Sequence, residues 1–469
     1  MINWLLLPLA LLSATADAYD ASPTLRARQN ANSSSGVGSI STTWYTGWHA
    51  TDFPLTAVSW SKYTHLTYAF AVTTPDVNTL GLETSDEELL PQFVSKAHQN
   101  NVKASLSIGG WTGSRWFSLN VGSAKNRTAF VKTVTGIVNK YKLDGVDFDW
   151  EYPGLQGIGC NVVNQDDTSN FLSFLHELRN TTTGSDLIIS AATYVTPYVD
   201  ASGQPSADVS AFSQVLDYMA IMNYDIRSSP TTGAGSSSPL DDSCAPSGAQ
   251  FGSATSAVKA WTTAGMPADK ILLGVPAYGH SYTITSGAEL LNGSDSILGA
   301  YPQYNPNRTR LGDKWDSDAG LDVCGALQGP GGTYTYWGLI QEGLLNADGS
   351  AKGGISYRFD NCSQTPFVYN PSTQTYISFD NAQSFTAKGN FIHAEGLKGF
   401  AMWEAGGDYQ DTLVNSIRSA MTTGEASTTA KKTEPSQSAA NSIHQRSSRD
   451  TSSYAILPAL FVLLGLSQG

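Results

Sequence analysis

Basic residues are scarce in this sequence. Lys and Arg together number 27 among 469 residues, against 40 Asp and Glu, so the formal net charge at pH 7 is -13. A surface with this excess of negative charge repels phosphate backbones and anionic lipid surfaces, and we therefore expect no nucleic-acid partner. Charged residues of all kinds make up only 14% of the chain, which makes any local cluster of them informative.

Cysteine is also sparse, and no separate cysteine-rich module is present. Four cysteines, an even number, fit two disulfide bonds formed in an oxidising compartment. Six glycosylation signals agree with that route. We expect no metal ion and no cofactor. The cysteines are Cys160, Cys244, Cys324 and Cys362, and the signals lie at Asn32, Asn126, Asn180, Asn292, Asn307 and Asn361.

The two ends of the chain lack an apolar run of the roughly 20 residues that a comfortable membrane span needs. Residues 1–18 hold the apolar "WLLLPLALL" and the small residues "SATADA", which predict a secretory signal peptide. Residues 422–453 form a Ser/Thr-rich linker, and the apolar tail 454–469 has no basic anchor after it. This pattern predicts exchange of the tail for a glycosylphosphatidylinositol anchor, the alternative being a frayed or weakly interfacial C-terminus. We expect a secreted, cell-surface or wall-associated monomer.

Short β-branched or aromatic runs recur along the chain, and helical patterns lie between several of them. The runs extend from "TTWYTGW" to "LKGFAMWEAGGD", and "NRTAFVKTVTGIVNKYK" is one of the helical patterns. Eight apolar strands alternating with helices predict an α/β fold, a (β/α)8 TIM barrel, with its chemistry at the C-terminal ends of the strands. We place the barrel in residues 42–283 and 377–421, after an N-terminal segment 19–41.

A long stretch rich in Gly, Tyr and Asn follows the seventh strand, which we place up to about Tyr282, and precedes "FDNAQSFTAKGNFIHAEG", the expected seventh helix. A structureless loop of roughly ninety residues is improbable in a compact domain. We therefore expect a small α+β insertion domain at residues 284–376, between strand 7 and helix 7, forming one wall of a groove on the barrel rim.

Four carboxylic acids gather in one apolar run, "LDGVDFDWEYP", with no Lys or Arg among them. Side chains alternate along a strand, so Asp147, Asp149 and Glu151 should face the barrel interior while the apolar residues between them face the helices. Like charges at close range raise pKa values, which keeps one proton available. Glu151, at the end of the strand, is the expected general acid, and Asp149 is its electrostatic partner.

These residues carry a resemblance. "DGVDFDWE" resembles the catalytic signature of glycoside hydrolase family 18, in which Asp-x-x-Asp-x-Asp-x-Glu lies on the fourth barrel strand. "SLSIGGW", "MNYD" and "GFAMWEAGGD" resemble the motifs of its third, sixth and eighth strands. The resemblance extends from Thr42 to Met421 in the order of the family, and the insertion resembles one that deepens the groove in a branch of the chitinases.

The resemblance implies substrate-assisted retaining hydrolysis of β-1,4 bonds in chitin and chitooligosaccharides. Glu151 would protonate the leaving oxygen, while the acetamido oxygen of the sugar attacks the anomeric carbon. Asp149 would hold the acetamido N–H and stabilise the oxazolinium charge. Asp147 would share a proton with Asp149, and Tyr224 would donate a hydrogen bond to the acetamido carbonyl.

The resemblance also implies a set of substrate contacts. Asp225 would bind the distorted sugar, Trp403 would form the floor of the reacting subsite, and Trp111 would stack on the sugar beyond it. Ordinary core packing is the alternative for Trp111. The expected substrate-binding residues are Trp403, Asp225, Met222, Trp111, Gly110 and Tyr152.

One position departs from the family pattern. Where family members commonly have Tyr-Gly-Arg after the seventh strand, this chain has Tyr278, Gly279 and His280. His280 could donate to a sugar hydroxyl, but it lacks the forked guanidinium of arginine. Two other functions remain open: an endo-N-acetylglucosaminidase acting on N-glycans, and a chitin-binding lectin without turnover. Retention of Glu151 favours an enzyme.

The positions of the cysteines favour one disulfide pairing among the three that four cysteines allow. Cys160 and Cys244 follow the fourth and sixth strands, so both should lie on the catalytic face of the barrel. Cys324 and Cys362 both belong to the expected insertion. We therefore expect bonds between Cys160 and Cys244 and between Cys324 and Cys362.

Overall fold

The computed structural model describes residues 36–226, 233–284, 287, 290 and 297–424. The expected signal peptide and apolar tail, and all but the first three residues of the expected linker, lie outside these ranges. Within the described residues, no helix has the length and apolar character needed to cross a membrane.

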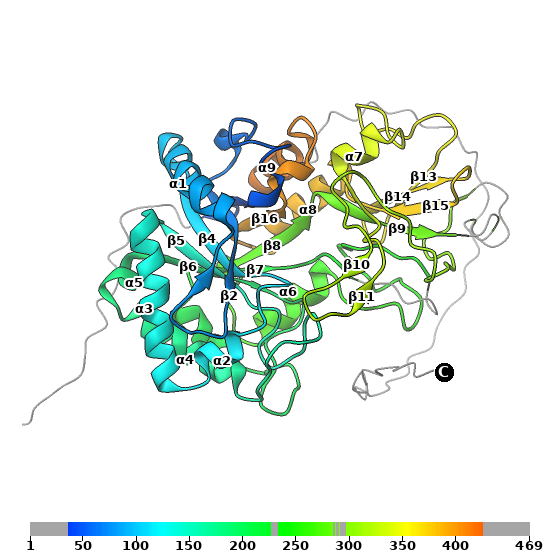
Figure 1. Ribbon diagram of the computed structural model, residues 1–469. Helices are drawn as coiled ribbons and strands as arrows, with labels where there is room; N and C mark the ends of the chain where they lie inside the picture. Colours follow the sequence, from blue (N-terminus) through cyan, green and yellow to red (C-terminus); the bar gives the residue numbers. More distant parts are fainter. Residues whose placement is uncertain (1–35, 227–232, 285–286, 288–289, 291–296, 425–469) are drawn as a thin grey trace, which may run out of the picture. The chain divides into compact units, whose positions relative to one another are not determined.

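Eight parallel strands form a closed ring, which confirms the expected barrel (Figure 1). Around the ring the strands follow the order β1-β16-β8-β7-β6-β5-β4-β2, and β2 pairs again with β1. A short strand, β3 (Leu80–Gly81), adds antiparallel to β2. The barrel strands are β1 (Ile40–Thr46), β2 (His65–Thr73), β4 (Lys103–Gly109), β5 (Gly145–Asp149), β6 (Ile188–Thr193), β7 (Tyr218–Ile221), β8 (Ile271–Pro276) and β16 (Gly399–Trp403).

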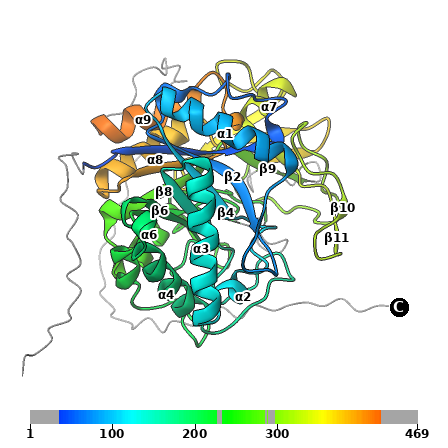
Figure 2. The same ribbon diagram turned by 60° about the vertical axis from the view of Figure 1, so that its left-hand side comes forward.

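Helices cover the outside of this ring, and Figure 2 shows α1, α3, α4 and α6 there. Side-chain caps define where several helices begin: Ser123 accepts a hydrogen bond from the backbone of Asn126 at the start of α3, and Ser253 forms a reciprocal pair with Ser256 at the start of α6. The helices are α1 (Thr84–Gln99), α2 (Phe117–Val121), α3 (Ala124–Tyr141), α4 (Asp167–Arg179), α5 (Thr182–Asp186), α6 (Ala254–Thr263), α8 (Ala382–Ala394) and α9 (Thr412–Thr423).

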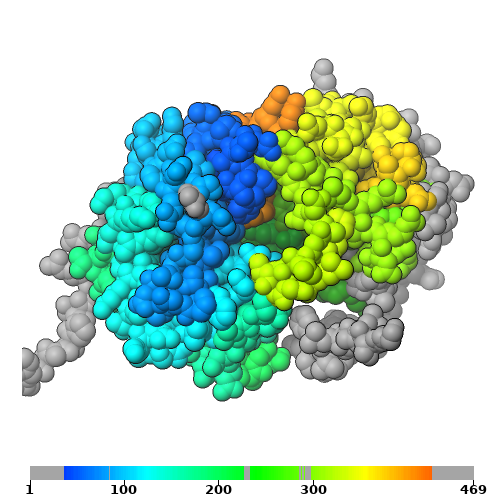
Figure 3. Space-filling view, viewed as in Figure 1, coloured from blue at the N-terminus to red at the C-terminus, as the bar shows by residue number. Residues whose placement is uncertain are grey.

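An antiparallel sheet of five strands, in the order β12-β9-β15-β14-β13, forms the insertion after β8. Helix α7 and the two-stranded β10–β11 hairpin accompany it. In Figure 3 a hollow lies between the dark-blue N-terminal part of the barrel and the yellow-green part of the insertion. The elements are β9 (Tyr278–Thr283), β10 (Gly320–Leu321), β11 (Leu327–Gln328), β12 (Thr333–Thr335), α7 (Tyr336–Gln341), β13 (Ser356–Asp360), β14 (Thr365–Asn370) and β15 (Thr375–Ser378).

The insertion begins earlier and ends later than the sequence predicts. The seventh barrel strand ends at Pro276 rather than near Tyr282, and Ala277 donates the next backbone hydrogen bond to the Trp403 carbonyl. From Tyr278 onward the chain pairs antiparallel with β12 and β15. The sheet of the insertion therefore extends from residue 278 to residue 378, because one apolar run supplies two strands that belong to different sheets.

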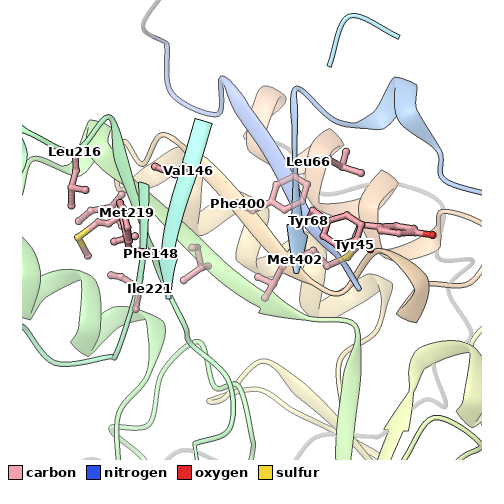
Figure 4. Close-up of a cluster of buried hydrophobic side chains, with 14 of the residues drawn as sticks. Tyr45, Leu66, Tyr68, Val146, Phe148, Leu216, Met219, Ile221, Phe400 and Met402 are labelled. Atoms are coloured by element: carbon pink, nitrogen blue, oxygen red, sulfur yellow. The ribbon is translucent and has the colours of Figure 1, made fainter. Parts of the chain in front are cut away.

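The core lies between the barrel strands and the surrounding helices. Alternate strand residues point outward and are buried under the helices, as Figure 4 shows. The opposite faces of the same strands hold a second, smaller cluster, in which small residues such as Ala69, Ala192 and Ala220 leave room for polar side chains. Figure 4 labels Leu216, just before β7, and the strand residues Tyr45, Leu66, Tyr68, Val146, Phe148, Met219, Ile221, Phe400 and Met402.

Candidate active site

The innermost carboxyl of the site belongs to Asp147, in the middle of β5. Its side chain is buried, and burial raises its pKa, although three hydrogen bonds to the carboxyl act in the opposite direction. The three donors come from different strands, so closure of the barrel assembles the environment of this carboxyl. They are Trp44 Nε1 of β1 at 3.2 Å, Ser107 Oγ of β4 at 2.8 Å and Ser190 Oγ of β6 at 2.7 Å.

Asp149 is the last residue of β5 and lies above Asp147 toward the mouth of the barrel. Its side chain is buried, and its Oδ1 receives no hydrogen bond from the described residues. Burial is the main cause that raises its pKa well above the ordinary range, and the charges of Glu151 and Asp147 add to it. A carboxyl in this position favours its protonated form and has an oxygen free to accept a hydrogen bond.

Glu151 follows the end of β5 and is partly exposed. Burial raises the pKa of its carboxyl to about 8; a hydrogen bond with the Tyr152 side chain opposes this shift, and the charge of Asp225 contributes to it. The backbone N–H of Glu151 donates to Ser114 Oγ at 3.0 Å, and its carbonyl accepts from Asn161 Nδ2 at 2.8 Å. The raised pKa favours the protonated form of this carboxyl, which is the form that a general acid needs.

Two residues after β7 complete the acidic site. Tyr224 is buried, and burial raises the pKa of its hydroxyl, with the charge of Asp149 as the next cause. Asp225 has a left-handed backbone, with φ of 55°. Its Oδ1 accepts a hydrogen bond from the Tyr278 hydroxyl at 2.8 Å and lies 2.6 Å from His280 Nε2. His280, at the position where the sequence departs from the family pattern, therefore contacts Asp225.

Aromatic rings surround the entrance to this site. Trp403, the last residue of β16, stacks on Phe70 with ring centroids 5.7 Å apart, and Trp48 stacks on the same ring at 6.1 Å. Trp48 is 57% exposed and Trp111, in the loop after β4, is 45% exposed. The exposure of Trp111 argues against core packing. Trp48 and Phe70 were not predicted for the site, although Trp48 ends the run "TTWYTGW" and Phe70 lies in the C-terminal half of β2.

The other expected contact residues lie on three different loops and strand ends. Gly110 has φ of +79°, and a Cβ there would lie 2.8 Å from the Phe70 ring, so glycine is required. Met222 is buried in the interior cluster of the barrel. Tyr152 packs against Tyr194 with centroids 5.2 Å apart. Among the residues that the structure describes, no group of acidic, His and Cys side chains is arranged to hold a metal ion.

The expected disulfide pairing is wrong. Cys160 bonds to Cys324, with Cα atoms 5.6 Å apart, and Cys244 bonds to Cys362, with Cα atoms 6.3 Å apart. The turn between β10 and β11 brings Cys324 to the loop that follows β5, whereas Cys362 lies in the turn between β13 and β14, beside the segment that follows β7. Cys324 and Cys362 both belong to the insertion, but they lie in different turns and each bonds to a cysteine of the barrel loops.

Comparison with known families defines the class of the protein. The family model described as Glycosyl hydrolases family 18 matches residues 41–408, so the chain belongs to this glycoside hydrolase family.

A chitinase-like effector of Moniliophthora roreri is 50% identical over 379 residues, which cover 81% of this chain and 92% of that protein. Chitinase A1 of Niallia circulans is 27% identical over 343 residues, covering 72% and 45%. A chitinase structure from Rhizomucor miehei superposes with a TM-score of 0.72 at 32% identity, covering 81% of this chain and 99% of that one.

Proposed function

We propose that the protein is a chitinase that hydrolyses the β-1,4 bonds between N-acetylglucosamine units. One observation carries this proposal: the buried Asp149 at the end of β5 has an Oδ1 without a hydrogen-bond donor among the described residues, and two residues later Glu151 has a carboxyl whose pKa burial raises to about 8, which favours its protonated form. The first carboxyl has a proton to give, and the second has an oxygen that can accept an N–H.

The reaction follows from this arrangement. Glu151 protonates the glycosidic oxygen, and the acetamido oxygen of the sugar on the other side of that bond attacks the anomeric carbon, so no enzyme nucleophile is needed. Asp149 accepts the acetamido N–H and stabilises the oxazolinium charge as it develops. In the resting site Asp149 shares a proton with Asp147; that proton passes to Asp147 when Asp149 accepts the acetamido N–H, which leaves Asp149 charged beside the oxazolinium. Tyr224 donates a hydrogen bond to the acetamido carbonyl. Water then attacks the anomeric carbon of the oxazolinium from the face that the leaving group has left, with Glu151 acting as base.

Turnover of a fluorogenic chitobioside tests this proposal. Glu151→Gln keeps the shape of the side chain but cannot deliver a proton, so kcat should fall by about 10²–10⁴-fold, the usual contribution of general acid catalysis. Glu88→Gln, on the exposed face of α1, is the matched control and should retain full activity. The first products should carry the β-anomer by rapid NMR of chitin oligomers. Early α-anomer, or near-normal activity of Glu151→Gln, would contradict the mechanism.

A second function has specific support. Two relatives at 50% and 48% identity are named chitinase-like effectors, so binding of chitin oligosaccharides without turnover is the alternative. Calorimetric binding of chitohexaose by a protein that does not turn over the chitobioside would identify this function. Release of glycans from a glycoprotein would instead identify an endo-N-acetylglucosaminidase.

We also propose that the protein is a secreted, glycosylated monomer with a lipid anchor. The N- and C-terminal sequence patterns support this location, and three glycosylation signals lie on exposed residues, Asn180, Asn307 and Asn361. Phosphatidylinositol-specific phospholipase should release the protein from membranes. A secreted protein whose mass still includes Leu460–Leu466 would exclude the anchor.

A further inference from the structure

A closed loop, here named the strap, projects from the insertion as residues 317–331 and contains β10 and β11. Its two ends are held together: Gly331 donates a backbone hydrogen bond to the Ser317 carbonyl at 3.0 Å. Next to them Asp316 Oδ2 accepts from the backbone N–H groups of Gly312 and Gly332, both at 2.7 Å. The strap therefore has a fixed base.

The tip of the strap is also fixed. Asp322 Oδ1 accepts hydrogen bonds from the backbone N–H groups of Cys324, at 2.8 Å, and Ala326, at 2.9 Å. Hydrogen bonding, with the Ala326 N–H as the largest contribution, lowers the pKa of Asp322 and keeps it ionised. Gly325 has φ of +80° in this turn. The tip thus presents the Cys324 side chain in one position.

This tip is attached to the opposite side of the barrel. The insertion leaves the barrel after β8, and β8 and β4 are four strands apart in either direction around the ring of eight. Yet Val323 accepts a hydrogen bond from Arg115 Nη1, in the loop after β4, at 3.4 Å. Cys324 is bonded to Cys160, in the loop after β5 that also contains Glu151. The chain thus crosses from one side of the barrel mouth to the other.

A second attachment lies where the strap leaves the insertion. Trp315 stacks on His49, with ring centroids 3.9 Å apart, and its Nε1 donates to Asp52 Oδ2 at 2.9 Å. His49 and Asp52 follow β1, next to Trp48. The strap is therefore held at the loops after β4 and β5, and Trp315, just before it, is held at the loop after β1; these loops include the general acid and the exposed tryptophans. Figure 3 shows the yellow-green part of the insertion along the edge of the hollow.

We propose that the Cys160–Cys324 bond makes the strap a covalent crossbar over the substrate cleft, so that a chitin chain enters by one of its ends and not sideways. This inference rests on the proposed function and adds a determinant of polymer specificity to it. Because the crossbar is closed by a covalent bond, thermal motion of the loops cannot open it. The Cys244–Cys362 bond joins the insertion to the segment after β7, the neighbour of β8, and does not cross the mouth.

The two disulfides provide a matched pair of variants. The double variant Cys160→Ser/Cys324→Ser opens the crossbar, and Cys244→Ser/Cys362→Ser removes a bond of similar span, with sequence separations of 164 and 118 residues. The measurement is the loss of viscosity of soluble glycol chitin for each new reducing end. Cuts inside a chain lower viscosity far more than cuts near its ends.

The wild type and Cys244→Ser/Cys362→Ser should show a small loss of viscosity per reducing end, and Cys160→Ser/Cys324→Ser should show a loss several-fold larger, with chitobioside turnover unchanged. If the loss of viscosity per reducing end is equal in the wild type and in Cys160→Ser/Cys324→Ser, the crossbar is overturned. If this double variant does not fold, a variant with residues 318–330 replaced by a short Gly-Ser segment, together with Cys160→Ser, takes its place under the same criterion.

A binding measurement separates failure of the crossbar from failure of the proposed function. If the wild type does not turn over the chitobioside, the proposed function is wrong. Binding is then measured to equal masses of glycol chitin of two chain lengths. The amount of bound wild-type protein should be larger on the shorter chains, which have more ends per mass. The amount of bound Cys160→Ser/Cys324→Ser should be the same on both, because the masses of glycol chitin are equal. Wild-type binding that depends only on mass, or is absent, contradicts the crossbar.

Discussion

Asp149 at the barrel mouth and two aspartates of the insertion, Asp316 and Asp322, are bonded in opposite ways. Asp149 is buried with an Oδ1 that no described donor reaches, and two acidic neighbours add to the rise in its pKa. Asp316 and Asp322 accept hydrogen bonds from several backbone N–H groups. Backbone donors stabilise a carboxylate, whereas burial without donors favours the neutral acid. The same residue type is therefore a buried acid with a raised pKa in one region and an acceptor that fixes loop backbone in the other.

The largest expected effect comes from removing the acid in the barrel. Asp149→Asn leaves the oxazolinium without a neighbouring charge, so kcat on the chitobioside should fall by about 10²-fold or more, as loss of electrostatic stabilisation typically costs. Its pH profile should also change, because a carboxyl that interacts with Glu151 has been removed. Thermal unfolding should show no loss of stability at pH 7. A variant that is unstable but fully active would reverse the roles assigned to the two regions.

In the insertion, removal of an aspartate should lower stability and leave activity unchanged. Asp316→Ala leaves the backbone N–H groups of Gly312 and Gly332 without their acceptor, and the free energy of unfolding should fall by about 1–3 kcal/mol. Turnover of the chitobioside should stay near normal, because Asp316 does not contact the carboxyls of the barrel. Asp318→Ala, on an exposed residue of the strap, is the control. Equal stability of the two variants in urea would show that the base of the strap does not depend on Asp316.

A smaller effect concerns stability and pH. The pKa of Glu151 is 4.5 in a model peptide and about 8 in the fold, so its contribution to stability is fully present below pH 4.5 and is lost as the pH rises through 8. Glu151→Gln removes this loss. Relative to the wild type, the variant should gain on the order of 1 kcal/mol or more at pH 8, since one pKa unit corresponds to about 1.4 kcal/mol. Melting temperatures that change in parallel from pH 4 to pH 8 would exclude the shift.

The smallest effect is on the pH profile. In the proposed mechanism the protonated form of Glu151 is the active one, so kcat/KM should fall as the pH rises through about 8. The charge of Asp225 contributes to this raised pKa. Asp225→Asn should therefore move this fall of kcat/KM to lower pH. The pH at which the fall occurs can be measured even if the substitution also weakens substrate binding. A fall at unchanged pH would mean that Asp225 acts only on the substrate.

The sequence predicted the part of the site that lies on one strand. Because side chains alternate, the positions of Asp147 and Asp149 require Phe148 to face the helices, and its ring indeed lies 5.9 Å from Phe171 of α4. The donors to Asp147 were not predictable in this way. Trp44 and Ser190 lie on other strands, far away in the sequence, and only closure of the barrel brings them to the carboxyl.

The insertion was predicted in outline and missed in its contacts. Length and composition indicate a folded insertion, but periodicity cannot show that Pro276 ends one sheet and Tyr278 begins another. Nor can it show where the β10–β11 hairpin reaches. The predicted disulfides paired cysteines of the same segment. The path of the chain across the barrel mouth instead brings Cys324 to Cys160.

The connectivity of the two disulfides has a consequence for biosynthesis. Counted along the chain, the first cysteine bonds the third and the second bonds the fourth. Synthesis from the N-terminus exposes Cys160 and Cys244 while Cys324 is still unmade, so the first pair that an oxidase meets is absent from the folded protein. A bond formed between them must be exchanged through thiolate attack before the insertion can dock. An expression host rich in disulfide isomerase should therefore raise the yield of folded protein more than one rich in oxidase alone.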